Sequence, residues 1–65
     1  MKAWKLRTRI LDEARNLADH DGEPFTICRE DNRVFPRPTR KALAMAASPR
    51  HPGLELMQEI EPRLK

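Results

Sequence analysis

The residues of this chain best suited to bind a ligand are basic, and they lie close together in the sequence. Four cations fall within the stretch NRVFPRPTRK, residues 32–41, and they are Arg33, Arg37, Arg40 and Lys41. Guanidinium and ammonium groups donate charge-assisted hydrogen bonds to phosphates and carboxylates. A helix is expected to begin at the end of this stretch, and the first turn of a helix adds unpaired backbone N–H groups. The pattern therefore predicts binding of an anionic partner.

Two kinds of partner fit these cations, nucleic acid and an acidic protein, and a solvated charged surface with no partner is the alternative. With nucleic acid, Arg37, Arg40 and Lys41 would hold phosphates, and binding would depend steeply on salt. The sequence has no helix-turn-helix signature. Its three aromatic residues are needed for the core, which leaves none for stacking on bases. Electrostatic attachment is therefore favoured over sequence-specific recognition.

Arg7 is a further candidate for an anion contact. It falls inside the apolar side of the first predicted helix, between Trp4 and Leu11. Its aliphatic stem can pack on Trp4 while the guanidinium group reaches water past the helix end. The alternative is an arginine held in place for a carboxylate or a phosphate. The two interpretations differ in whether the Arg7 head group has a partner.

Nucleophilic or metal-binding chemistry would need Cys28 together with His20 or His51. Cys28 lies in a strand-like run, where a buried thiol with a packing role is expected. No pair of these residues has the close spacing that zinc sites use, and the two glycines are too far apart to form a phosphate-binding loop. A chain of 65 residues also leaves little room for a pocket that excludes water. We therefore expect a non-enzymatic binding protein with no catalytic residue, no metal and no cofactor.

The composition predicts one small soluble domain with a solvated surface, since the net charge is +3 and the mean hydropathy is −0.79. A single cysteine excludes an intramolecular disulfide, which is typical of a cytoplasmic protein. No apolar run approaches the length of about 20 residues that a membrane-spanning helix needs, so no membrane association is expected. A chain this short buries only about 60% of its unfolded surface. A second copy in a homodimer, or another partner, would therefore stabilise its core.

The first predicted element is an amphipathic helix over residues 3–20. Its apolar side chains fall on one arc of a helical wheel, at Trp4, Leu6, Ile10, Leu11, Ala14, Leu17 and Ala18. Gly22 can adopt the left-handed conformation beyond the last turn, and Pro24 cannot continue a helix. The helix is therefore expected to end just before Gly22.

A β-hairpin is predicted over residues 24–36, because strand-forming residues flank the polar pair Asp31-Asn32. Asp and Asn tolerate positive φ, so a turn of two residues is possible there. Pro36 is expected to end the second strand. An isolated hairpin is unstable in water, so its apolar face must pack on the first helix.

Two registers are possible for this hairpin. A two-residue turn would pair Arg29 with Val34, and Cys28 with Phe35. The apolar face would then consist of Phe25, Ile27 and Val34. A three-residue loop would instead move Phe35 onto that face, because a shift of one residue reverses the side that each side chain occupies.

Two short helices are predicted to complete the chain, over residues 39–48 and 52–61. Pro38 suits the first turn of the earlier helix, or Thr39 caps it. Pro52 can open the last helix, whose apolar side chains lie on more than one side, at Leu54, Leu56, Met57 and Ile60. An apolar side left uncovered in so short a chain indicates a partner interface. These four residues are the predicted interface, whether the last helix docks on the core or becomes ordered only on binding.

Together these elements predict an α+β fold with one small core over residues 1–65, built from a helix, a hairpin and two short helices. The leading functional hypothesis is a small basic regulatory protein of bacterial or phage type that binds DNA. The alternative is a protein-interaction module, such as an antitoxin, an inhibitor of a host enzyme or a small subunit of an assembly. That module would use the apolar tail helix and the four cations against an acidic protein.

Overall fold

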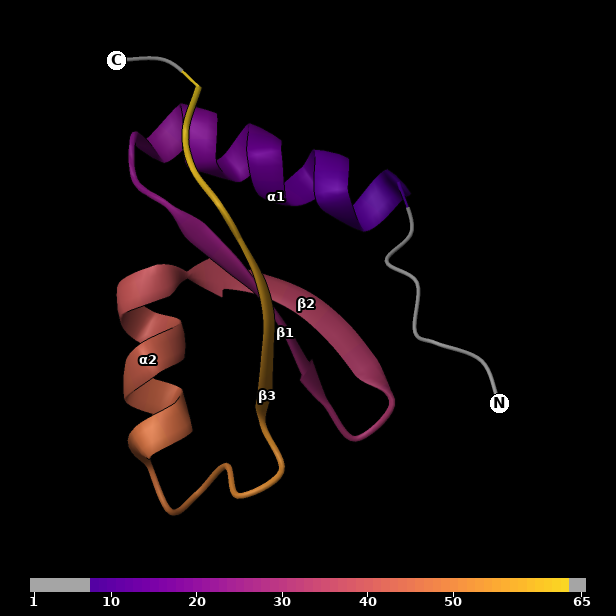
Figure 1. Cartoon of the computed structure of the whole chain (residues 1–65), viewed down its shortest axis with the longest axis vertical. Helices are drawn as coiled ribbons and strands as arrows, with labels where there is room; N and C mark the ends of the chain where they lie inside the picture. The colour runs from indigo at the N-terminus through magenta and orange to yellow at the C-terminus, as the bar shows by residue number, and fades with distance from the viewer. Residues whose placement is uncertain (1–7, 64–65) are drawn as a thin grey trace.

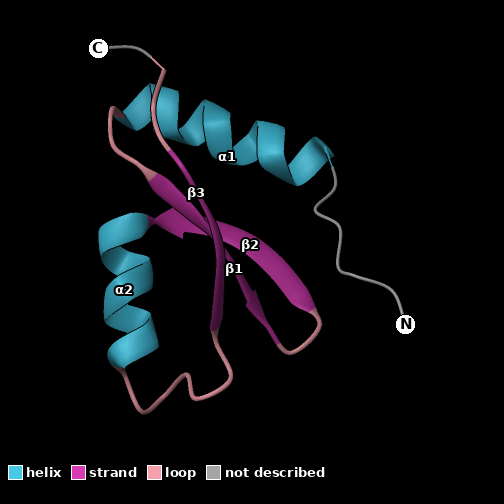
Figure 2. Cartoon of the chain, in the orientation of Figure 1, coloured by secondary structure: helices cyan, strands magenta, loops and turns pink. Residues whose placement is uncertain are grey.

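Five elements follow one another in the computed structural model, which describes residues 8–63 (Figure 2). They are helix α1 at Thr8–Asp21, strand β1 at Phe25–Glu30, strand β2 at Arg33–Pro38, helix α2 at Thr39–Ala47 and strand β3 at Glu55–Ile60. The strands form one sheet in the order β2-β1-β3, and all neighbours are antiparallel. The predicted α+β class is confirmed, with two helices and three strands in the described part of the chain.

The two helices lie on opposite sides of the sheet (Figure 1). On one side, Ala14 of α1 belongs to a core cluster with Ile27 of β1 and Ile60 of β3. On the other side, the buried hydroxyl of Thr26 in β1 is hydrogen-bonded at 2.8 Å to the hydroxyl of Thr39, the first residue of α2. Because side chains alternate along a strand, β1 is covered on both faces. This central position explains why its first four residues, FTIC, are all buried.

Helix α1 matches the predicted amphipathic helix where the structure describes it. Ala14 and Ala18 are fully buried on its sheet-facing side. The helix ends because Gly22 has a φ of 69°, and the N–H of Gly22 donates to the carbonyl oxygen of Ala18 at 2.8 Å. The start of the predicted helix lies outside the described residues, and with it Trp4, Leu6 and Arg7.

The hairpin between β1 and β2 has the two-residue turn. Asp31 has a φ of 58°, a left-handed conformation that Asp tolerates better than most residues. This turn pairs Cys28 with Phe35. Of the two registers considered, the one with a two-residue turn is therefore confirmed. It places Phe35 on the opposite face of the sheet from Ile27.

The sequence predicts that the second strand ends at Pro36, but β2 continues to Pro38. In an antiparallel pair, alternate residues of an edge strand direct their N–H groups away from the partner. Pro36 and Pro38 are two residues apart and fit these outward positions, so neither interrupts the pairing with β1. Proline is excluded from a central strand but is compatible with an edge strand, and β2 is an edge.

The helix predicted over residues 52–61 is wrong, because Glu55–Ile60 forms strand β3. The hairpin alone would leave one side of β1 unpaired. Buried N–H and C=O groups need hydrogen-bond partners, and a helix packed beside β1 would not supply them. An antiparallel third strand does, and this long-range demand overrides the local preference for a helix.

A β-bulge conceals this strand in the sequence. Ile27 is paired with Gln58 and Cys28 with Leu56, which leaves Met57 as an extra residue on β3. A bulge interrupts the alternation of side chains between the two faces of a strand. The apolar residues of β3 therefore lack the period of two by which a strand is recognised.

Candidate functional site

Strand β2 presents a short basic row toward the α2 side of the sheet. Arg37 is paired with Thr26, whose hydroxyl bonds to α2, and alternation places Phe35 and Arg33 on the same side. The guanidinium carbon of Arg37 lies 4.6 Å from the centre of the Phe35 ring. Its Nη1 donates to the carbonyl oxygen of Pro36 at 2.8 Å. These two contacts hold the guanidinium group above the ring.

The first turn of α2 places two more cations close to this row. Pro38 is the N-cap residue and Thr39 the first helical residue, so Arg40 and Lys41 follow directly. The Thr39 hydroxyl, one of the two predicted helix starts, bonds to Thr26 instead of capping the helix. No side chain within residues 8–63 caps this helix start. The backbone N–H of Thr39 donates to the carbonyl oxygen of Pro24 at 2.9 Å, so the electropositive region consists of the N–H groups that follow it in the first turn and of the two cations.

Arg40 differs from the other three predicted cations because it already has a carboxylate partner. Its Nε donates to Oε1 of Glu23 at 3.0 Å, and its Nη2 donates to Oε2 at 3.4 Å. This bidentate pair ties the start of α2 to the segment between α1 and β1. Arg33, Arg37 and Lys41 are exposed, and they form no ion pair with any residue of the described chain. Three of the four cations are therefore available to an external anion.

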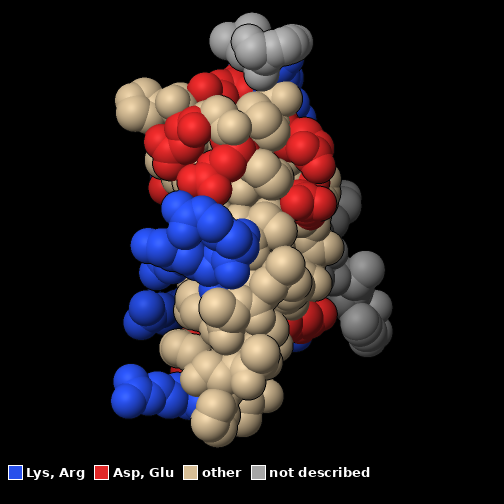
Figure 3. Space-filling view, turned by 90° about the vertical axis from the view of Figure 1, so that its left-hand side faces the viewer, with Lys and Arg blue, Asp and Glu red and all other residues tan. Residues whose placement is uncertain are grey.

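Figure 3 views the molecule from the α2 side, where Lys and Arg side chains gather along one margin and Asp and Glu side chains lie mainly toward the top. Arg50 is a further exposed cation, and it was not among the predicted site residues. It lies beyond the C-terminal end of α2, and a helix of nine residues spans only about 14 Å. Arg50 is therefore within reach of the same extended ligand as Lys41, although it stands outside the basic stretch of the sequence.

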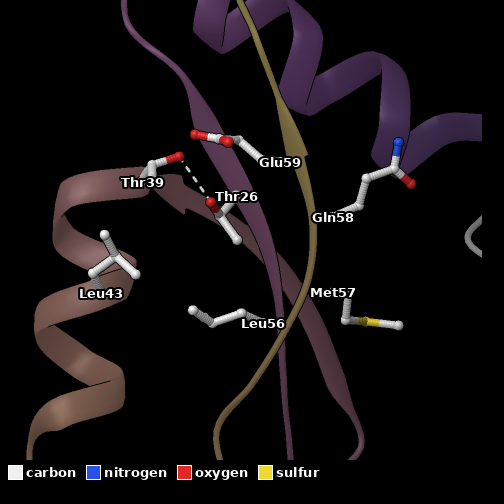
Figure 4. Close-up of a pocket in the computed structure, with 7 residues that line it drawn as sticks. All are labelled: Thr26, Thr39, Leu43, Leu56, Met57, Gln58 and Glu59. Atoms are coloured by element: carbon white, nitrogen blue, oxygen red, sulfur yellow. Dashed lines mark hydrogen bonds between the residues drawn. The ribbon is translucent and has the colours of Figure 1, made fainter.

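The four residues predicted as a partner interface do not form one surface. Ile60 is 4% exposed and belongs to the core cluster, and Met57 packs against that cluster. Leu54 is half-buried ahead of β3, and Leu56 is 37% exposed. Figure 4 shows that Leu56 and Met57 point to opposite sides of β3. The predicted interface is therefore divided between the core and the surface, because Leu56, Met57 and Ile60 lie on a strand and not on a helix.

Leu56 lines an open depression of about 400 Å³ between α2 and β3 (Figure 4). The lining residues are Thr26, Thr39, Leu43, Leu56, Met57, Gln58 and Glu59. Leu43 of α2 is 56% exposed, and it and Leu56 are the large apolar side chains most open to solvent in the described part of the chain. The sequence alone does not predict this exposure of Leu43, because it depends on where α2 docks.

Cys28 and His51 each have a partner of their own. Cys28 is fully buried, its Sγ donates to the carbonyl oxygen of Thr26 at 3.6 Å, and burial raises the pKa of its thiol. The Nδ1 of His51 lies 2.9 Å from Oε2 of Glu30, which joins the loop before β3 to the hairpin. Within residues 8–63, no three His, Cys, Asp or Glu side chains are grouped so as to hold a metal ion. Cys28 thus has the surroundings of a packing residue.

Neither helix in the described range has both the length and the apolar character needed to cross a membrane. No protein-family model, curated protein or solved structure matches this chain. The functional conclusion therefore depends on the geometry and the charge of the site itself.

Proposed function

We propose that the protein is a small nucleic-acid-associated regulatory protein that binds phosphates through a basic surface. This basic surface consists of Arg33 and Arg37 on β2, and Arg40 and Lys41 in the first turn of α2. The observation that carries the proposal is that three of these cations are exposed without a carboxylate partner in the described chain, on one side of the sheet. A surface that served only for solubility would have its charges dispersed among carboxylates.

The spacing of the basic surface suits a polyanion. Arg33 and Arg37 are four residues apart on one strand, which separates them by about 13 Å. Successive phosphates on one DNA strand advance by about 3.4 Å along the helix axis. Two arginines at this spacing can therefore contact separate phosphates of one strand, while Lys41 contributes from the neighbouring helix.

The contact of Arg37 with Phe35 favours binding in a second way. A long side chain that is free in solution loses rotamer entropy when it is held by a ligand. The ring of Phe35 and the carbonyl oxygen of Pro36 already restrict the guanidinium group of Arg37. Less entropy is then lost on binding a phosphate, and Arg37 is expected to contribute most per side chain.

Fluorescence anisotropy of a labelled DNA duplex, titrated between about 50 mM and 200 mM salt, tests this function. Replacing both Arg37 and Lys41 with Gln is expected to reduce the slope of log affinity against log salt by about 2. The matched control replaces Arg9 and Arg15 of α1 with Gln, which changes the net charge equally on the other side of the sheet. The control slope is expected to stay near that of the unmodified protein.

Failure to bind duplex at the lower salt concentration would contradict the proposal. An equal loss in both double variants would do so as well, because it would show attraction by net charge and no defined surface. A protein-interaction module is the second candidate function, and the exposure of Leu43 and Leu56 in one depression favours it.

A further inference from the structure

The two edges of the sheet differ in their ability to accept another strand. Among the residues of β2, Pro36 and Pro38 have no N–H, and both occupy outward positions. Strand β3 at Glu55–Ile60 contains no proline, so every residue carries a donor and an acceptor. Because β1 uses only one side of β3, the outward N–H and C=O groups of β3 have no strand partner within residues 8–63.

The depression between α2 and β3 runs beside this open edge (Figure 4). Its walls include Leu43 and Leu56, which are 56% and 37% exposed. The hydroxyls of Thr26 and Thr39 are hydrogen-bonded to each other at 2.8 Å on the inner side. The depression therefore offers apolar contact area next to a row of free backbone groups.

Glu59 adds a charge to the same place. It lines the depression, it is exposed, and it forms no ion pair with a described residue. Glu55 of the same strand is paired with Arg29 at 2.7 Å, so the free carboxylate is the one beside the depression. A ligand on this edge therefore meets an apolar wall and an unpaired negative charge.

We propose that β3 and this depression form a docking groove for an extended, basic segment of a partner protein, which adds to the sheet as a fourth strand. The β3 groove is defined by Leu43, Leu56, Glu59 and the outer edge of β3. Backbone hydrogen bonds to β3 would give affinity, and side chains entering the groove would give specificity. The proposal does not depend on nucleic-acid binding, since the basic surface includes the opposite edge strand.

The register of the sheet defines the pattern that this segment must carry. Leu56 is paired with Cys28 and Glu59 with Thr26, so the bulge leaves Leu56 and Glu59 only two β1 residues apart on one face. Same-face positions of an added strand are also two residues apart, about 7 Å. The segment is therefore expected to present an apolar side chain and a Lys or Arg at positions i and i+2.

Charge favours this occupant over a second copy of the chain. If two β3 strands paired with each other, Glu55 and Glu59 of both copies would share one short ladder, and like charges across strands are destabilising. Strand β2 of a second copy carries arginines, but its prolines lack the outward donors that strand addition needs. A basic strand from a different protein meets both requirements.

The test is an NMR titration of ¹⁵N-labelled full-length protein with a synthetic peptide of alternating pattern, Ser-Val-Thr-Leu-Thr-Lys-Thr, capped at both ends. The expected result is a shift of the β3 amides with little change on β2. A peptide with Glu in place of Lys is expected to bind on the order of tenfold more weakly. The variant Glu59→Lys, altered at an exposed position, is expected to reverse this preference.

A second peptide, N-methylated at alternate peptide bonds, serves as the backbone control and is expected to lose binding. The reversal by Glu59→Lys cannot arise from unfolding, since that variant gains affinity for the other peptide. Absence of β3 shifts with the Lys peptide would overturn the proposal, and so would equal affinity for the Lys and Glu peptides. A dimer in light scattering with β3 amides already protected from exchange would overturn it in favour of a second copy.

Discussion

The two edge strands of this sheet flank the same central strand but have opposite properties. Strand β2 is basic and carries two prolines, whereas β3 is acidic and has a donor at every position. Unprotected edges invite pairing with other chains, and proline and charge on an edge strand discourage it. Strand β2 thus presents charged side chains at its edge, whereas β3 presents unpaired backbone N–H and C=O groups as well.

The two strands also differ in how they are attached to β1. A two-residue turn holds β2 to β1, so this pairing is local in the sequence. Strand β3 follows α2 and returns to β1 over a long connection, and its pairing depends on the core side chain Ile60. The edge that is open to a partner is therefore the edge whose own position depends on tertiary packing.

The largest effect is expected when β3 is detached from the core. The variant Ile60→Asp places an unpaired charge at a position that is 4% exposed, and it is expected to lower the free energy of unfolding by about 3 kcal/mol or more. The matched variant Leu56→Asp alters the same strand at a position that is 37% exposed, and a loss of only about 1 kcal/mol is expected. Urea unfolding followed by circular dichroism measures both. Equal losses of the free energy of unfolding in the two variants would contradict the placement of Ile60 in the core and of Leu56 at the surface.

A smaller effect is expected when the outward N–H groups that β2 lacks are supplied by mutation. Replacing Pro36 and Pro38 with Thr supplies two outward N–H groups, and the double variant is expected to self-associate with rising concentration. Its free energy of unfolding is expected to change by less than about 1 kcal/mol, because neither proline interrupts the pairing with β1. Light scattering over a concentration series measures the association. A double variant as monomeric as the unmodified protein would show that proline is not what closes this edge.

The smallest effect concerns the segment that follows β3, which is tied to α1 through a contact of Arg63 with Asp19. The backbone N–H and the guanidinium group of Arg63 donate to the Asp19 carboxylate, and these hydrogen bonds lower the pKa of Asp19 below its usual 3.8. The folded state therefore binds this proton less readily than the unfolded state does. The stabilisation is complete above the usual pKa and is lost as the pH falls through the lowered value.

The variant Asp19→Asn removes this titration, so its free energy of unfolding is expected to fall less steeply with decreasing pH below about pH 4 than that of the unmodified protein. Urea unfolding at neutral and acidic pH measures the difference. Asp12 is an exposed carboxylate on α1 without an ion pair in the described chain, and Asp12→Asn serves as the control. An identical pH profile for Asp19→Asn and the unmodified protein would show that the contact with Arg63 is not maintained in solution.

The basic surface could be predicted from the sequence because its members lie within ten residues of each other. Which of these cations another side chain engages could not be predicted from the sequence. Arg40 is engaged by Glu23, which lies 17 residues earlier, and Arg37 is held by Phe35 only because both lie on one face of a strand. The β3 groove was not predicted, because Leu43 and Leu56 belong to elements that meet only in the folded chain.

The sequence by itself determined the elements whose signals are local. The helical period and Gly22 predict where α1 runs and ends, and the pair Asp31-Asn32 predicts the turn of the hairpin. The reason is that helix periodicity and turn conformation depend on residues within a few positions of one another. The sequence leaves the register of the hairpin open between two alternatives, and the structure decided it.

Only the tertiary structure decided whether residues 55–60 form a helix or a strand. Their apolar residues fit a helix or a bulged strand, and nothing within the segment distinguishes the two. The unpaired side of β1, about thirty positions earlier, requires hydrogen-bond partners, and β3 provides them. The same pairing buries Ile60, exposes Leu56 and creates the open edge, because each depends on which strand lies beside β1.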